Sequence, residues 1–192
     1  MHMEQTLQKM RQLRLSAMAQ SLESRLERGE HRNTDPEAFI TRLIDDETEA
    51  RASKRIKSLI QKAQLRPEQA CLENIRHNSA RGFTKTDLER FYRPDWIERA
   101  ENMVFTGATG TGKTYLAEGL AFQACRMGYS SRKLSQNKLV EEIRCHRAMG
   151  QYGKFLKSME QTKVLVIDDF LIDQHGAAQY CEILHVLEER IG

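Results

Sequence analysis

Residues that could hold a fold together through disulfides or metal ions are scarce in this sequence. The four cysteines are scattered, with no C-x-x-C pair and no cysteine–histidine cluster at zinc spacing. This distribution argues against a disulfide framework and against a structural zinc site. Cys125 and Cys181 fall on the faces of predicted helices, so we expect reduced thiols in the hydrophobic core.

Long apolar runs are also missing. Hydrophobic residues make up 40% of the 192 residues and charged residues 30%, and no run of 18 apolar residues occurs, so no transmembrane helix is expected. Residues 1–6 lack the basic-then-apolar profile of a secretory signal. Together with the reduced cysteines, these features predict a cytoplasmic protein with no membrane partner.

Aromatic residues form only 7% of the chain, which has a single tryptophan. Trp96 lies near a predicted domain junction, where it could stack on a nucleic-acid base. A lone tryptophan beside Ile97 is more typical of a hydrophobic core, and we adopt that interpretation.

The most informative segment that is present is GATGTGKT at residues 107–114, which fits the phosphate-binding pattern G-x-x-x-x-G-K-[ST] at every fixed position. Residues 103–106 predict a short buried strand, and residues 113–127 predict a helix with one apolar face. A strand, a glycine turn and a helix start bring backbone N–H groups and the positive helix end onto one anion. Lys113 would contact the outer phosphates and the Thr114 hydroxyl would ligate Mg²⁺. The predicted nucleotide-binding residues are Gly107, Ala108, Thr109, Gly110, Thr111, Gly112, Lys113 and Thr114.

A second motif, KVLVIDD at residues 163–169, joins four apolar residues to two acids. It predicts a fully buried parallel strand whose carboxylates lie at the C-terminal edge of the sheet, where ligands bind in open α/β sheets. Asp168 would hold the Mg²⁺ shell and Asp169 would polarise the attacking water. Taken alone, the segment could be a buried strand with an acidic turn. Its order and its distance of about 55 residues from the first motif favour a nucleoside triphosphate site.

The first half of the chain predicts helices throughout. Apolar residues recur every three or four positions from Leu7 to Leu26 and end at Gly29, a helix terminator. A second helix begins after Asp35 as its cap, with Pro36 in the first helical position, and runs to about Leu65. We therefore predict an all-α N-terminal domain over residues 1–80 and a nucleotide-binding domain over residues 81–192.

The remainder of the second half predicts one more strand and further helices. Residues 129–135 predict a strand, although Arg132 and Lys133 fit a buried strand poorly. Helical patterns follow at 139–149 and 179–190.

The second helix divides sharply by charge, with an acidic cluster over residues 45–49 followed by basic residues. The basic residues that can share one face are Arg51, Lys54, Arg55 and Lys62. Such a stripe suits a nucleic-acid phosphate backbone, and the chain's net charge of +3 arises in its first half. The alternative is a solvated helix whose basic end complements the helix dipole and pairs with the acids one turn away.

Several segments resemble the IstB/DnaC-like ATPases of the AAA+ group, which are helper ATPases of insertion-sequence transposition and their helicase-loader relatives. The resemblance rests on the P-loop followed by YLA, and on SQNKLVEEI, VLVIDDF and EILHVLEER in the second half. In the first half, MRQLRLSAMAQSL and FITRLIDDETEARASKRIKSLIQKAQL resemble the IstB side more than the loader side. The resemblance covers essentially the whole chain. It implies an α/β fold: a P-loop NTPase of AAA+ type with a parallel sheet, preceded by an all-α N-terminal domain.

Position by position, the resemblance gives the P-loop glycines, Lys113 and Thr114 the phosphate and Mg²⁺ roles, with ATP as the nucleotide. It makes Asp168 the metal-shell carboxylate and gives Asp169 the catalytic role of polarising the attacking water. Many P-loop ATPases have Glu at this last position, whereas IstB-like members commonly have Asp.

The chain departs from the family pattern at its end. In the family, a strand with a polar sensor residue follows the acidic strand and lies between it and the P-loop strand. The sequence stops at Gly192, before that strand and before the arginine that reaches a neighbour's γ-phosphate. We therefore expect a C-terminally truncated member with an incomplete sheet. Hydrolysis should be weak, because an arginine finger contributes about 10³–10⁵ in rate, and neither Arg147 nor Arg190 is expected to replace it.

The resemblance implies an ATPase that binds DNA, assembles on it as a homo-oligomer, and delivers or activates a transposase. Duplex DNA is a more natural ligand than single-stranded DNA under this hypothesis. One alternative is a helicase loader that docks on a replicative helicase through its N-terminal helices. Another is a non-catalytic fragment that binds DNA or protein. A small-molecule P-loop kinase is disfavoured, since the long helical half has no place in that architecture.

Overall fold

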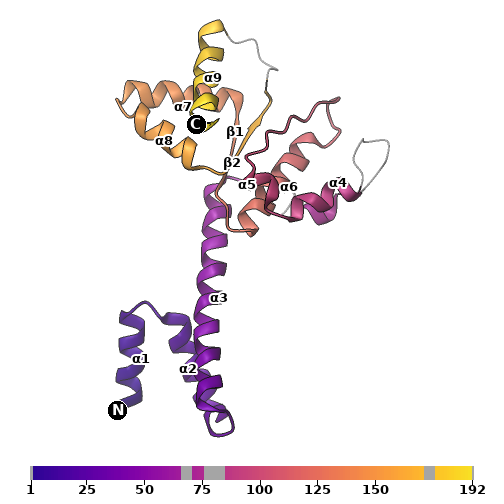
Figure 1. The fold of residues 1–192 in the computed structure, drawn as a ribbon. Helices are drawn as coiled ribbons and strands as arrows, with labels where there is room; N and C mark the ends of the chain where they lie inside the picture. The colour runs from indigo at the N-terminus through magenta and orange to yellow at the C-terminus, as the bar shows by residue number, and fades with distance from the viewer. Residues whose placement is uncertain (1, 66–70, 76–84, 171–175, 192) are drawn as a thin grey trace. The chain divides into compact units, whose positions relative to one another are not determined.

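The computed structural model describes residues 2–65, 71–75, 85–170 and 176–191, drawn as a ribbon in Figure 1. The chain divides into two compact units, Met1–Arg55 and Ile56–Gly192. The boundary predicted between residues 80 and 81 lies outside the described residues and stays a prediction.

Helices form the first unit, as the apolar spacing predicted. They are α1 (His2–Gln12), α2 (Ser16–Glu27), the 3-10 helix η1 (Glu30–Arg32) and α3 (Pro36–Lys62), which continues into the second unit. The single apolar pattern from Leu7 to Leu26 belongs to two helices, because Arg14 adopts a left-handed φ of 61° between α1 and α2. Gly29 follows α2 with a φ of 74°. The Asp35 carboxylate accepts the backbone N–H groups of residues 37 and 38 and caps α3, as predicted.

Polar contacts attach α2 to α3 within this unit. The N-cap position of α2, Leu15, has no side chain that can cap the helix. Instead the Glu47 carboxylate of α3 accepts the backbone N–H of Met18 at 2.9 Å, which satisfies one of the unbonded donors at the start of α2. The Asp46 carboxylate accepts hydrogen bonds from Ser21 and Arg25 of α2.

The second unit alternates helices with two strands. Its elements are the 3-10 helix η2 (Leu72–Asn74), α4 (Lys85–Glu89), the 3-10 helix η4 (Arg90–Tyr92), α5 (Asp95–Glu98), α6 (Lys113–Arg126), β1 (Ser131–Ser135), α7 (Gln136–Ala148), α8 (Tyr152–Gln161), β2 (Val164–Asp168) and α9 (Ala177–Ile191). The strands pair in parallel, with a register from Ser131 opposite Val164 to Ser135 opposite Asp168. The connection between two parallel strands must cross over the sheet, and here it carries α7 and α8 (Figure 1).

Two hydrophobic clusters hold the second unit together. The first joins α4, η4, α5 and one side of α6, and the second joins β1, α7, α8 and α9. Trp96 is 4% exposed and its ring meets Phe91 edge to face, so the core interpretation of this tryptophan is confirmed. The expectation of core thiols is right for Cys125, which is buried, and wrong for Cys181, which lies on an exposed position of α9.

The segment before the P-loop differs from its prediction. Residues 103–106 alternate as a strand would, since Met103 and Phe105 pack against the first cluster while Val104 is 84% exposed. They form no ladder, because within the described ranges the two strands of the sheet pair only with each other. The predicted strand is therefore wrong, although its period-2 pattern is correct.

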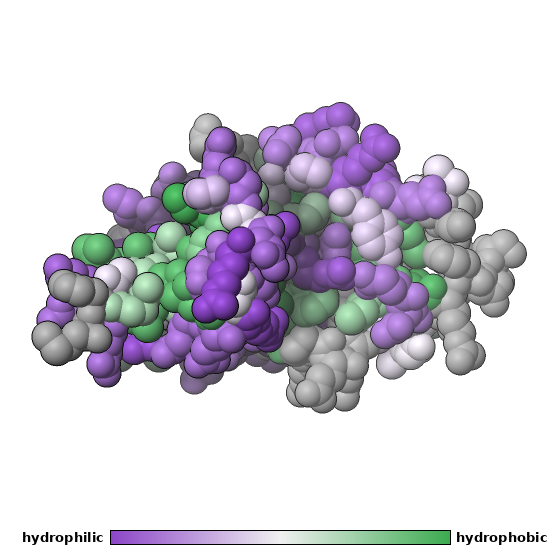
Figure 2. Space-filling view, turned by 90° about the horizontal axis from the view of Figure 1, so that it is seen from below, coloured by the Kyte–Doolittle hydropathy of each residue, from purple (hydrophilic) through white to green (hydrophobic). Residues whose placement is uncertain are grey.

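Hydrophilic residues cover much of the face shown in Figure 2, with hydrophobic residues at the surface between them. Exposed large apolar side chains of the first unit include Leu13, Ile40 and Ile44. In the described part of the chain, no helix combines the length and the apolar character needed to cross a bilayer.

Candidate nucleotide-binding site

The P-loop owes its shape to three glycines. Gly107, Gly110 and Gly112 have φ angles of 148°, 82° and 93°, in the region where a Cβ atom introduces strain and glycine does not. Gly112 is the N-cap residue of α6. The glycine positions of the sequence motif are therefore those at which the chain turns from the extended segment into the helix.

Lys113 folds back onto this loop. Its ammonium group donates to the carbonyl oxygens of Gly107 at 2.9 Å and Ala108 at 2.8 Å, and the Thr111 hydroxyl also donates to Ala108. The ammonium of the first residue of α6 thus holds the loop in a closed conformation through its carbonyl groups. Its amide groups lie at the positive end of α6, where an anion is favoured.

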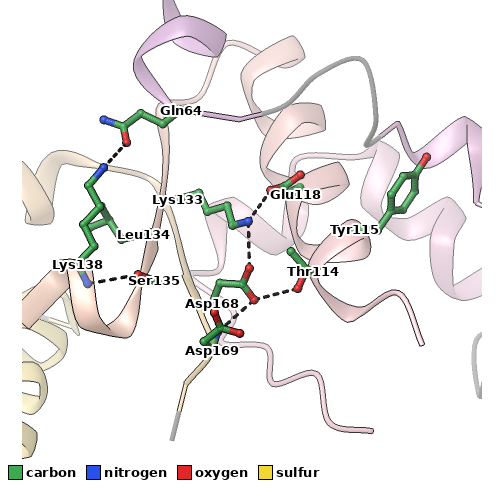
Figure 3. A pocket seen from close by; sticks show the side chains of 10 residues that line it. All are labelled: Gln64, Thr114, Tyr115, Glu118, Lys133, Leu134, Ser135, Lys138, Asp168 and Asp169. Carbon is green, nitrogen blue, oxygen red and sulfur yellow. Dashed lines mark hydrogen bonds and ion pairs between the residues drawn. The ribbon is translucent and has the colours of Figure 1, made fainter. Parts of the chain in front are cut away.

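The two sequence motifs meet through Thr114 and Asp168. The Thr114 hydroxyl donates to Asp168 Oδ1 at 3.0 Å, although the residues are 54 positions apart in the chain. The backbone N–H of Asp169 donates to the same oxygen at 3.1 Å (Figure 3). The hydroxyl and the carboxylate that were predicted to share a metal are therefore neighbours.

These oxygens are the donor type that Mg²⁺ takes. Mg²⁺ is usually held by one or two protein groups together with phosphates and water. Over the described residues, no group of three or more His, Cys, Asp or Glu side chains could enclose a metal ion. One hydroxyl and one carboxylate match the number of protein groups that Mg²⁺ takes when phosphates and water supply the remaining oxygens.

Asp169 follows directly after β2 with an unusual backbone. Its φ is 54°, a left-handed conformation that is uncommon outside glycine. Such strain persists where the surrounding structure imposes it, and it is frequent at functional sites. Asp169 lines the same cavity as Asp168.

A cavity of about 530 Å³ opens beside Thr114 and Asp168, within the range of small-molecule sites. Its lining residues are Gln64, Thr114, Tyr115, Glu118, Lys133, Leu134, Ser135, Lys138, Asp168 and Asp169. Lys138 donates to Gln64 at 2.9 Å, and the Ser135 hydroxyl caps α7. The cavity therefore reaches from the metal-type residues to the start of α7.

Three charged residues of this cavity, Glu118, Lys133 and Lys138, were not predicted from the sequence as site residues. Lys133 of β1 lies 3.0 Å from Asp168 Oδ2 and also pairs with Glu118 of α6 (Figure 3). Both side chains are well covered, with 18% exposure for Lys133 and 9% for Glu118. The available signal was a lysine in the middle of a predicted buried strand, which indicates a partner of opposite charge.

The charges shift the pKa values of this cluster. Burial by itself would raise the pKa of Asp168, but hydrogen bonds from Lys133 and Thr114 outweigh it and the pKa is lowered. Burial would likewise lower the pKa of Lys133, but its bonds to Glu118 and Asp168 raise it. Both groups are therefore fully charged at neutral pH.

The two arginines considered as fingers are engaged away from this cluster. Arg190 donates to the carbonyl oxygens of Met159 and Thr162 at the C-terminal end of α8. The Arg147 guanidinium lies over the ring of Tyr152, 4.6 Å from its centroid, and pairs with Glu182.

The predicted DNA-binding residues lie on α3. Arg51, Lys54, Arg55 and Lys62 are all exposed. Arg51 pairs with Glu47 at 2.8 Å and donates to the Arg14 carbonyl at 2.9 Å. The pairing of basic and acidic residues one turn apart is thus present for Arg51, and DNA contact by the four residues stays a prediction.

Similarity to known proteins extends over almost the whole chain. The profile of the family described as IstB-like ATP binding protein matches residues 8–192. A Pseudomonas fluorescens protein named as an ATP-binding protein of insertion sequence IS1162 is 31% identical over 189 residues, which cover 98% of this chain and 82% of the relative. A Sinorhizobium fredii protein named as insertion sequence ATP-binding protein y4uH is 29% identical over 187 residues, with coverage of 97% and 75%. A Bacteroides fragilis protein named as an ATP-binding protein of an IS21-like insertion sequence is 22% identical over 192 residues, with coverage of 98% and 73%.

Proposed function

This chain belongs to the family of IstB-like ATP binding proteins, and from that premise we propose that it is a DNA-associated helper ATPase of insertion-sequence transposition. Membership gives it the family's α/β P-loop domain, a helical N-terminal region and ATP binding. The observation that carries the proposal is the 3.0 Å hydrogen bond between Thr114 and Asp168, which unites the P-loop with the acidic strand.

ATP binding would reorganise the P-loop around the phosphates. The backbone N–H groups at the start of α6 would donate to phosphate oxygens. Lys113 would exchange the carbonyls of Gly107 and Ala108 for the outer phosphates, which carry more negative charge. The lysine therefore has a place both before and after nucleotide binding.

Thr114 and Asp168 would hold Mg²⁺, which when bound neutralises charge on the transferred phosphoryl group. Asp169 would accept a hydrogen bond from the water that attacks the γ-phosphate. Hydrolysis by a single chain should be slow, because Arg147 and Arg190 bond to other groups and an arginine finger, where one is supplied, raises the rate by about 10³–10⁵.

DNA would bind to the exposed basic residues of α3. They lie in the half of the sequence that carries the positive excess, and the relatives are named for insertion sequences. The ligand we propose is duplex DNA, on which the protein would assemble with further copies of itself and deliver or activate a transposase.

The first test is a thermal melt of the full chain with and without Mg-ATP. The free energy gained from a bound ligand is about 2.7 kcal/mol at a hundredfold excess over Kd, so the parent Tm should rise. Lys113→Ala should lose this rise, because the P-loop ammonium is gone. Lys154→Ala, which removes an exposed lysine of α8, should keep it. Equal shifts in the parent and in Lys113→Ala would contradict the proposed site.

A further inference from the structure

Asp168, the carboxylate expected to ligate the metal, has a lysine ammonium group beside it. Lys133 Nζ lies 3.0 Å from Asp168 Oδ2, and the other partner of this ammonium is Glu118 Oε1 (Figure 3). Three elements supply the three groups, since Asp168 ends β2, Lys133 lies in β1, and Glu118 lies one turn beyond the start of α6.

The two oxygens of Asp168 have separate partners. Oδ1 accepts from the Thr114 hydroxyl and from the backbone N–H of Asp169, whereas Oδ2 pairs with Lys133. One oxygen thus faces Thr114, the other residue expected to hold Mg²⁺, and the second oxygen faces the ammonium. This division holds the carboxylate in one orientation.

Lys133 is also held in place through its backbone. Its N–H donates to the Ala63 carbonyl at 3.1 Å, and its position in β1 is opposite Val166 of β2. The side chain is 18% exposed, so the ammonium has little room to swing into solvent. The structure therefore places the ammonium beside Asp168, largely covered from solvent.

We propose that Lys133 is a positioning residue that acts as an internal counter-ion of Asp168 and keeps divalent metal out of the site until a nucleotide brings its own negative charge. Asp168 and Glu118 together carry two negative charges and Lys133 cancels one, so a free divalent ion meets a weakened attraction. The negative charge of the ATP phosphates restores the attraction of the site for a divalent ion. This inference rests on the proposed ATP site.

The test is direct titration of the nucleotide-free full chain with Mn²⁺. The electron paramagnetic resonance signal of the unbound Mn²⁺ measures how much of the ion is bound at each step. Lys133→Met removes the positive charge and should tighten Mn²⁺ binding about tenfold, as expected for a unit charge a few ångströms away. Glu118→Gln removes a negative charge beside the same ammonium and should weaken binding. Lys133→Arg keeps the charge and should bind like the parent, as should Lys154→Met, the distant control.

Opposite shifts in Lys133→Met and Glu118→Gln support the counter-ion, because a folding defect would weaken both. The counter-ion is also supported if Lys133→Met binds Mn²⁺ detectably and the parent binds none. Unchanged or weaker binding by Lys133→Met overturns the inference.

A parallel melt with ATP separates this inference from the proposed function. A parent Tm that rises with Mg-ATP, together with unaltered Mn²⁺ binding by Lys133→Met, rejects the counter-ion alone. A parent Tm that does not change with Mg-ATP rejects the ATPase proposal. The Mn²⁺ titrations then still decide whether Lys133 weakens the binding of divalent metal at Asp168.

Discussion

Single side chains carry the chemistry of this site, and Thr114 is the clearest case. Its hydroxyl bonds to Asp168 across 54 positions of sequence. Its neighbour Lys113 bonds to the loop carbonyls instead. The two residues of the motif therefore have separable functions, one toward the metal and one toward phosphate.

Thr114→Val keeps the shape of the side chain and removes the hydroxyl. We expect the affinity of this variant for ATP to depend less on Mg²⁺ than that of the parent, because Asp168 remains but one metal ligand is lost, at a cost of about 1–2 kcal/mol relative to the parent with Mg²⁺. Calorimetric titration with ATP, with and without Mg²⁺, measures this. Thr41→Val removes an exposed hydroxyl bonded within α3 and should behave as the parent. A variant whose affinity for ATP rises with Mg²⁺ as much as that of the parent would remove Thr114 from the metal site.

The left-handed backbone of Asp169 makes a second prediction at this scale. Asp169→Gly and Asp169→Ala both remove the carboxylate, but only glycine adopts a φ of 54° without strain. The glycine variant should be more stable to unfolding than the alanine variant by about 1 kcal/mol, as measured in urea. Both should lack ATP hydrolysis. The reverse order of stability would show that the backbone relaxes when the aspartate is lost.

At the scale of elements, helices and strands that depend on contiguous residues were predictable from the sequence, and contacts between distant residues were less so. The P-loop, the helices α3 and α6 and the strand ending at Asp168 follow from contiguous residues, and the sequence predicted them. The prediction that this strand is fully buried is wrong, because β2 is only half-buried along its length. The rule that ligands bind at the carboxyl ends of parallel strands accounts for the position of Asp168 at the end of β2, whereas Thr114 lies at the start of α6 and not on a strand.

Features that depend on a distant partner were not predictable. The pairing of Lys133 with Glu118 requires the position of β1 relative to α6, which no local pattern contains. Residues 103–106 have the alternation of a strand, yet a strand also needs a neighbour that hydrogen-bonds to it. The break at Arg14, with its left-handed φ of 61°, interrupts an apolar pattern that continues on both sides of it.

The cap of α2 by Glu47 makes a prediction at the element scale. The hydrogen bond from Met18 N–H, followed by that from Arg51, lowers the pKa of Glu47. A lowered pKa means that the carboxylate stabilises the fold above its unfolded pKa and that this contribution is lost as the pH falls through the folded pKa. Glu47→Gln should therefore melt several degrees below the parent at pH 7, and the difference should narrow toward pH 3.

Circular dichroism melts across this pH range measure the effect. Glu49→Gln changes an exposed acid of α3 and should show no comparable difference. A gap between parent and Glu47→Gln that stays constant with pH would mean that the carboxylate's charge has no part in the cap.

At the scale of the whole molecule, the proposed DNA contact has a measurable electrostatic signature. Each phosphate neutralised on duplex DNA contributes about −0.9 to the slope of log K against log salt, and about −0.7 on single strands. Lys54→Gln with Arg55→Gln should weaken duplex binding and make the slope less negative by nearly 2. Lys154→Gln with Lys157→Gln, which changes α8, should leave both quantities unchanged. Tighter binding of single strands would favour the helicase-loader alternative.

The hydrogen bond from the Lys133 amide to Ala63 makes this amide a probe of local opening in the second unit by hydrogen exchange. An amide hydrogen locked between a strand and the turn after a helix exchanges with solvent only when that region opens. Because Lys133 lies in β1, the deuterium uptake of its amide reports the opening of the contact between β1 and Ala63, on the strand whose lysine side chain contacts Asp168. Slower uptake with bound ATP would measure, in free energy, how far the nucleotide tightens this strand.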